Sequence, residues 1–227
     1  MEKQYEVLLK HINKLEGSEL HRNKNEHDVT NAYGIYRYQH PKDPIWNYID
    51  SIAASITRAP SHAWDSKTIT SIDAKINKAT DLELSYNFYK KYLGALDITQ
   101  YPEDLVVSIV TCFVNTQVGT WKALQEALND CYKYKLFTFI PPKTQPNGDI
   151  LLVDGKFGNT SKGALKAYVD NLKTKDVETQ RLYNIIFKNC MLLYMKTHYA
   201  ELAINRTEDF IGVLKGWCNR VENTQHI

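Results

Sequence analysis

The chain has 227 residues, enough for one large domain or two smaller ones that each bury a core. Hydrophobic residues make up 43% of it and charged residues 24%, a balance typical of globular domains, which argues against an intrinsically disordered chain. The net charge of +2 arises from 28 basic and 26 acidic residues, so charge gives no indication of nucleic-acid binding.

The N-terminus lacks the basic start and apolar run of a secretory signal, and no apolar stretch approaches the roughly 20 residues of a membrane span. We therefore expect no membrane span, and a protein made in a bacterial cytoplasm without a signal peptide. The cysteines are far apart and form no C-x-x-C pair, which predicts reduced thiols, mostly in the core, rather than a zinc or redox motif. They are Cys112, Cys131, Cys190 and Cys218.

Residues 2–16 are predicted to form a helix, because apolar side chains recur at spacings of three and four and Gly17 follows as a stop. Residues 18–31 are almost all polar, which indicates a long loop or an irregular hairpin. Residues 33–38 are predicted to form a short strand or a turn. The chain thus begins with one helix followed by irregular structure.

Helical patterns dominate the rest of the chain. The helix that begins at Tyr101-Pro102 is unusually apolar and is predicted to lie in a core, with Gly119 as its break. A loop at 141–148 and a short strand at 150–153 interrupt the pattern. The predicted helices cover 45–57, 68–80, 81–93, about 102–118, 120–132, 160–172, 176–203 and 206–222. The fold class is therefore mainly α, with a few short strands near the N-terminus.

Glu16 is the first candidate for chemistry. It stands in the last turn of the first predicted helix, where the negative end of the helix dipole and burial beside Leu15 would both raise the pKa of a carboxyl group. A raised pKa suits a general acid near neutral pH. The same position also suits an ordinary solvated glutamate at a helix end, so these residues alone leave both readings open.

The wider pattern resembles the opening motif of glycoside hydrolase family 108, the phage and prophage muramidases. Glu16-Gly17 is followed by Thr30-Asn31 and then by Tyr33-Gly34-Ile35, with Ala32 inserted. The resemblance implies a lysozyme-like α+β fold and places Glu16 on the catalytic glutamate of the family. It also implies peptidoglycan as the partner, without a cofactor or a metal.

Later segments extend the resemblance over about residues 14–220. Val114-Asn115 is similar to the end of a core helix of the family, and residues 124–128 to the helix that follows it. Residues 154–160 are similar to the turn that opens the next helix, and residues 216–220 to the closing motif. We therefore expect a catalytic lobe at residues 1–97. A helical lobe at 98–227, resembling the peptidoglycan-binding region of the family, would pack against it.

The second catalytic group is not matched. Nine residues beyond Glu16, where related lysozymes carry an aspartate, this chain has Asn25. Asp28 and Glu26 are the nearest carboxylates, and Thr30 is the alternative, as the residue that positions an attacking water. An inverting glycosidase keeps its two carboxyl groups roughly 6.5–9.5 Å apart.

The resemblance also suggests substrate contacts. Asn31, Tyr33 and Tyr36 follow the motif, and Asn115 ends the apolar helix, where an amide could bind an N-acetyl group. Helix capping and half-buried packing remain equally simple readings for these side chains. The histidines have no spacing typical of metal ligands, so we expect no metal.

Three functions remain open. The chain is expected to be a muramidase, a lytic transglycosylase that uses one glutamate on the same bond, or a non-catalytic wall-binding or virion structural relative. A phage lysis enzyme would act at the periplasmic cell wall, and an entry enzyme would be carried in the virion with phage tail components.

Overall fold

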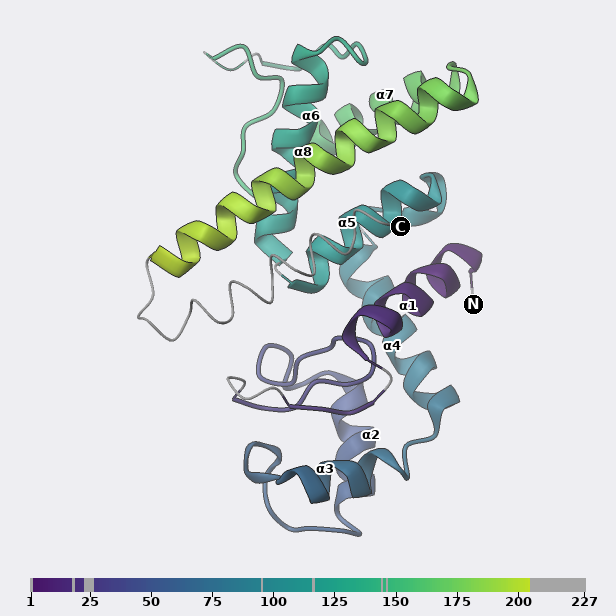
Figure 1. The fold of residues 1–227 in the computed structure, drawn as a ribbon, viewed down its shortest axis with the longest axis vertical. Coiled ribbons are helices and arrows are strands. Elements are labelled where there is room, and N and C mark those ends of the chain that lie inside the picture. Colours follow the sequence, from purple (N-terminus) through teal and green to yellow (C-terminus); the bar gives the residue numbers. More distant parts are fainter. Residues whose placement is uncertain are drawn as a thin grey trace. The chain divides into compact units, whose positions relative to one another are not determined.

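A computed structural model gives the fold (Figure 1), and it is mainly helical, as predicted. It describes residues 2–17, 19–22, 27–94, 96–115, 117–143, 145 and 147–204, with backbone alone at 115, 117, 118 and 202–204. The chain divides into two compact units, Met1–Thr99 and Gln100–Ile227. The sequence placed this boundary at residues 97 and 98. The helix predicted over 206–222 lies outside the described residues.

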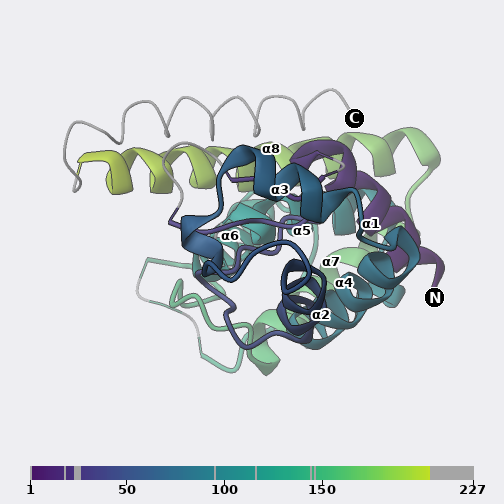
Figure 2. The ribbon, with the colours of Figure 1, turned by 90° about the horizontal axis from the view of Figure 1, so that it is seen from below.

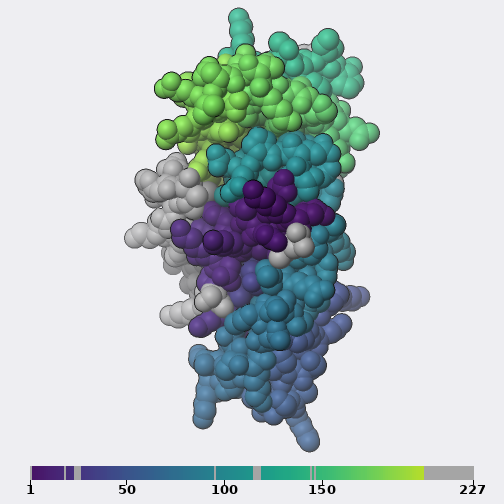
Figure 3. All heavy atoms as spheres, turned by 90° about the vertical axis from the view of Figure 1, so that its right-hand side faces the viewer, coloured from purple at the N-terminus to yellow at the C-terminus, as the bar shows by residue number. Residues whose placement is uncertain are grey.

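The first unit is built around contacts of two helices with α4. Figure 3 shows α1 against α4, and Figure 2 shows α2 beside α4. Apolar side chains such as Leu8, Ile49 and Leu93 are fully buried in its core. The elements are α1 (Lys3–Glu16), α2 (Pro44–Ala53), the 3-10 turn η1 (Ser61–Ala63), α3 (Ser66–Asp73) and α4 (Lys78–Leu93), followed by η2 (Ile98–Gln100).

Polar caps set the starts of three helices in this unit. Asp43 accepts a hydrogen bond from the Ile45 amide at the start of α2, and Asp65 caps α3. Asn77 accepts from two amides at the start of α4. This last cap corrects the predicted boundary between residues 80 and 81, because α3 already ends at Asp73 and α4 begins behind Asn77.

The segment between α1 and α2 contains isolated bridges in place of the predicted strands. His21 pairs with Thr30, and Thr30 with Tyr36, while no longer ladder is present in the described part of this segment. Gly34 has φ +73°, a left-handed conformation that turns the chain between Thr30 and Tyr36. The chain therefore folds back after one pairing, and a strand over residues 33–38 does not form.

The second unit is a set of helices in which α6 and α8 pack most closely, and Figure 1 shows α8 crossing α6. Its helices are α5 (Glu103–Asn115), α6 (Gln117–Lys133), α7 (Asn159–Lys173) and α8 (Val177–Ile204). The predicted break at Gly119 is wrong, because α5 ends at Asn115 and Gly119 lies inside α6. The buried helix α5 was predicted as core, and Ile109 and Val110 are fully buried.

The connection from α6 to α7 is held by two buried amide side chains of α6. Asn129 donates to the Leu151 carbonyl at 3.1 Å and accepts from the Leu151 amide at 2.9 Å. Gln125 donates to Asp154 and Lys156 and accepts from Gly155. No strand forms over the predicted range 150–153, and the Asn129 amide pairs with both backbone groups of Leu151 as a partner strand would.

Among the described residues, no helix is long and apolar enough to cross a membrane.

Candidate active site in the first unit

Glu16 is the last residue of α1 and is half-buried. The next residue, Gly17, has φ +95° and ψ 164°, and its amide donates to the Asn13 carbonyl, which ends the helix. The buried phenol of Tyr89 on α4 lies close to Glu16. Burial and, second to it, the negative charge of Glu16 raise the pKa of Tyr89. The catalytic candidate therefore stands where α1 meets α4.

Asn31 ties the predicted motif to α4. Its side-chain nitrogen donates to Asp81 at 3.1 Å and to Ser85 at 3.0 Å. Its side-chain oxygen accepts from the backbone amides of Tyr33 at 3.1 Å and Ile35 at 2.9 Å. The side chain is only 1% exposed. In this conformation Asn31 cannot contact a substrate, and its hydrogen bonds instead position the chain from Thr30 to Ile35.

Two further hydrogen bonds hold the same segment. Asn13 of α1 donates to the Ala32 carbonyl at 3.1 Å, and the Tyr89 hydroxyl donates to the Tyr33 carbonyl at 2.7 Å. The end of α1 and the motif segment are thus fixed to the same side of α4. We refer to Asn13, Asn31, Asp81, Ser85 and Tyr89 as the anchor residues.

Thr30 and Tyr33, the other two predicted site residues of the motif, are largely shielded from solvent. Thr30 is 4% exposed and pairs through its backbone with both His21 and Tyr36. Tyr33 is half-buried, and its pKa is raised by burial and, second, by the charge of Asp81. The nearly buried Thr30 side chain can therefore contact a small molecule such as water but not a sugar ring.

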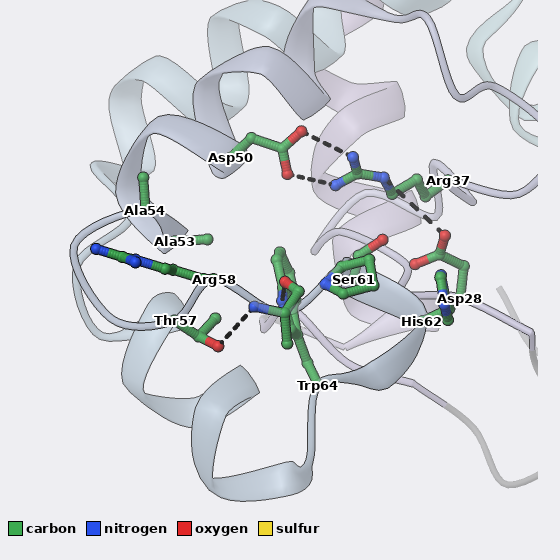
Figure 4. A pocket seen from close by; sticks show the side chains of 12 residues that line it. Asp28, Arg37, Asp50, Ala53, Ala54, Thr57, Arg58, Ser61, His62 and Trp64 are labelled. Carbon is green, nitrogen blue, oxygen red and sulfur yellow. Dashed lines mark hydrogen bonds and ion pairs between the residues drawn. The ribbon is translucent and has the colours of Figure 1, made fainter.

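Asp28 lies at a separate place in the same unit, on the wall of an open cavity of about 740 Å³ (Figure 4). Its carboxylate accepts from the Val29 amide at 2.8 Å and faces the Arg37 guanidinium at 4.0 Å. Arg37 makes a two-pronged ion pair with Asp50 at 2.6 and 2.7 Å. Asp50 thus holds the Arg37 guanidinium, which lies beside Asp28 at ion-pair distance without a direct hydrogen bond.

The loop from residue 57 to residue 64 forms another part of the cavity wall. Arg22 donates to the carbonyls of His62 and Trp64 at 2.7 and 2.6 Å and so holds the loop. The Trp64 indole is buried and donates to the Ala59 carbonyl. Figure 4 shows His62 and Asp28 on the same side of the cavity. The lining thus combines two carboxylates, two guanidinium groups and an imidazole.

Aromatic rings lie beside the motif at the surface. The Tyr36 ring is 6.0 Å from the Tyr38 ring, which is 5.3 Å from the His27 ring. The Tyr36 hydroxyl accepts from the His27 amide at 2.8 Å, and Tyr38 is 64% exposed. An exposed tyrosine of this kind can stack on the apolar face of a sugar ring.

Two predicted site residues cannot be placed. Glu26 lies outside the described residues. Asn115 is the final residue of α5 in the second unit, and its side chain is outside the described part of the chain. Within the described residues, no group of three or more histidine, cysteine, aspartate or glutamate side chains could hold a metal ion.

Sequence reasoning missed Asn13, Asp81, Tyr89 and the Arg37–Asp50 pair. Asp81 and Tyr89 are separated from the motif by about half the unit, so no local pattern links them to it. Asn13 had one signal, since it lies one turn before Glu16 on the same helix. Arg37 had no signal beyond its place after the motif.

Comparison of the chain with protein-family models, with curated proteins and with solved structures gives no match. The case for a function therefore rests on the residues and their geometry.

Proposed function

We propose that this chain is a peptidoglycan hydrolase, an N-acetylmuramidase whose first unit is lysozyme-like and related to glycoside hydrolase family 108. The bond cleaved would be the one between N-acetylmuramic acid and N-acetylglucosamine. A phage enzyme of this kind acts at the periplasmic wall, either at lysis or, carried in the virion, at entry.

One observation carries the proposal. The motif segment from Thr30 to Ile35 is held against α4 by hydrogen bonds of Asn31 and Tyr89. Asn13, one turn before Glu16, joins α1 to the same segment through the Ala32 carbonyl. A helix-end glutamate and a motif segment fixed by buried side chains form the rigid support that a catalytic acid needs.

The proposed chemistry follows the general scheme of glycoside cleavage, for which lysozyme is the type case. Glu16 donates its proton to the glycosidic oxygen as the bond to the anomeric carbon breaks. Water positioned by Thr30, with Asp28 or Glu26 as base, attacks the anomeric carbon and completes the hydrolysis. The exposed ring of Tyr38 beside Tyr36 offers an apolar face for a bound sugar.

A lytic transglycosylase is the second candidate, and the setting of Asp28 favours it. One Asp28 oxygen already accepts from the Val29 amide and the other faces Arg37 at 4.0 Å, so Asp28 is placed as the partner of a guanidinium. A transglycosylase needs no second carboxylate, because the muramic acid C6 hydroxyl attacks the anomeric carbon in place of water. The product is then a 1,6-anhydro sugar.

Purified sacculi test both candidates. We expect the wild type to clear a sacculus suspension and Glu16→Gln to lose at least about 100-fold in rate, because general acid catalysis contributes that much. Glu6→Gln, an exposed residue of the same helix, serves as the matched control and should retain full activity. Mass spectrometry of the soluble fragments separates reducing muramic acid ends from 1,6-anhydro ends.

Two results would contradict the proposal. If Glu16→Gln clears sacculi as fast as the wild type, Glu16 is not the catalytic acid. If the wild type is inert yet sediments with sacculi, the chain is a wall-binding or structural relative.

A further inference from the structure

The open cavity of the first unit is not explained by the proposed chemistry, because Glu16 is not among the residues that line it (Figure 4). Its volume of about 740 Å³ lies within the range of roughly 300–1,000 Å³ that is typical of small-molecule sites. Three segments form its wall, namely Asp28 with Arg37, the end of α2 with Asp50, and the loop from 57 to 64.

The loop wall is held by hydrogen bonds within the protein. Arg22 donates to the carbonyls of His62 and Trp64 at 2.7 and 2.6 Å. The Thr57 hydroxyl accepts from the Ala59 amide at 3.0 Å, and the Trp64 indole donates to the Ala59 carbonyl at 2.8 Å. A wall held in this way loses little conformational freedom when a ligand binds, which favours binding.

One side of the cavity has one carboxylate in excess. Both oxygens of Asp50 accept from Arg37, at 2.6 and 2.7 Å. One oxygen of Asp28 accepts from the Val29 amide at 2.8 Å, while the other faces Arg37 at 4.0 Å without a direct hydrogen bond. Two carboxylates thus share one guanidinium, and the second Asp28 oxygen has acceptor capacity left for a cationic donor such as an ammonium group.

The other side of the cavity has a guanidinium in excess. Arg58 is exposed, lines the cavity and makes no ion pair with any residue that the structure describes. Figure 4 shows it on the opposite side from Asp28 and His62. A guanidinium binds a carboxylate through two parallel hydrogen bonds. The two sides together therefore fit a ligand that has both an ammonium and a carboxylate group.

We propose that this cavity binds the peptide stem of peptidoglycan, through an ammonium group at Asp28 and Asp50 and a carboxylate at Arg58. The inference rests on the proposed function and names a second part of the substrate. In walls that contain meso-diaminopimelate, the side chain of this stem residue ends in one ammonium and one carboxylate. Asp28 then serves binding, which leaves the role of base to Glu26 or, in a transglycosylase, to no residue.

The cavity wall is continuous with the motif segment. The Arg37 amide donates to the Val29 carbonyl at 3.0 Å, and Thr30 pairs with Tyr36. The chain that carries Asp28 and Arg37 therefore folds back on itself around the motif. Because muramic acid carries the stem peptide, a site for the stem is expected beside the site for the sugar.

Calorimetric titration of the full chain tests the site without any cleavage. The probe is the free tripeptide L-Ala-γ-D-Glu-meso-diaminopimelate, and we expect it to bind the wild type. Arg58→Gln should weaken binding about 10-fold, because it removes a charged hydrogen-bond donor. Asp28→Asn should weaken it by a similar factor, since asparagine keeps an acceptor for the Val29 amide and removes the charge. Acetylation of the free amino group of the diamino acid should also abolish binding.

Lys42→Gln is the matched control, because Lys42 is an exposed cation of the same unit that does not line the cavity. It should bind the tripeptide as the wild type does. The proposal is overturned if the tripeptide gives no binding heat, if Arg58→Gln and Lys42→Gln weaken binding equally, or if the acetylated tripeptide binds as tightly as the free one. Free meso-diaminopimelate that binds as tightly as the tripeptide would identify a free amino acid as the ligand and overturn the assignment to the stem.

The two proposals fail in different ways. A wild type that binds the tripeptide but leaves sacculi intact would contradict the hydrolase and not the binding site. A wild type that clears sacculi but does not bind the tripeptide would contradict only the binding site.

Discussion

At the scale of single residues, Asp81 is a carboxylate that the first unit buries at a cost in free energy. Its side chain is 1% exposed, although a carboxylate pays a large desolvation cost when it is buried. Burial raises its pKa, and the hydrogen bond from Asn31 and the charge of Lys78 oppose that rise. Asp81 is retained in this position as an acceptor for Asn31, which positions the motif segment.

Asp81 makes the stability of the first unit depend on pH. Because its pKa is higher in the folded state than the unfolded value of 3.8, the folded state binds more protons between these two values. The contribution to stability is complete below the unfolded pKa and is lost as the pH rises through the folded pKa. We therefore expect Asp81→Asn to remove this loss and to raise the free energy of unfolding at pH 7 relative to the wild type.

Urea unfolding at a series of pH values measures the effect. Glu83→Gln, an exposed residue of the same helix, is the control and should leave the pH profile unchanged. An Asp81→Asn profile that keeps the slope of the wild type would show that Asp81 does not titrate in the folded protein as described.

At the scale of elements, the junction after α1 depends on a glycine. Gly17 combines φ +95° with ψ 164°, a region that residues with a Cβ rarely occupy, and a Cβ built there meets no atom within 4 Å. The requirement for glycine is therefore set by the backbone and not by crowding. This conformation directs the chain away from the helix axis directly after Glu16.

We expect Gly17→Ala to lower the free energy of unfolding by roughly 1–3 kcal/mol, the usual cost of this backbone region for a residue with a side chain. Gly158→Ala is a matched control. Gly158 has φ −88° and ψ −174°, which any residue adopts, and its Cβ would also meet open space. Urea titration should show a change within about 0.5 kcal/mol for the control. Equal losses in both variants would contradict the backbone explanation.

At the scale of the whole molecule, each of the two units has its own core. Ile49 of α2 is fully buried in the first unit and Leu128 of α6 in the second. Truncating either residue to alanine leaves a cavity and costs about 2–5 kcal/mol. Because the residues lie in different units, we expect each change to act on its own unit.

Amide hydrogen exchange with mass spectrometry tests this independence. Ile49→Ala should accelerate exchange in helices α1 to α4 and leave α6 and α8 as protected as in the wild type. Leu128→Ala should do the reverse. If either variant loses protection equally in both units, the chain unfolds as one cooperative body.

The sequence by itself determined most of the helices and the position of Glu16 at a helix end. These features depend on contacts between residues a few positions apart, such as the turn after α1 and the apolar spacing of α5. Local periodicity and capping residues are sufficient for them. The predicted start of α4 at residue 81 is wrong because the Asn77 side chain caps the helix at Lys78, and the apolar pattern alone does not show this cap.

Only the tertiary structure decided which polar side chains meet. Asn31 had been read as a substrate contact, yet it is buried by Asp81 and Ser85 of a helix that begins far along the chain. The pairing of Asp28 with Arg37 was equally unpredictable. Such contacts depend on how helices pack. A polar side chain that packing buries forms hydrogen bonds to other buried groups, and these bonds hold neighbouring segments together.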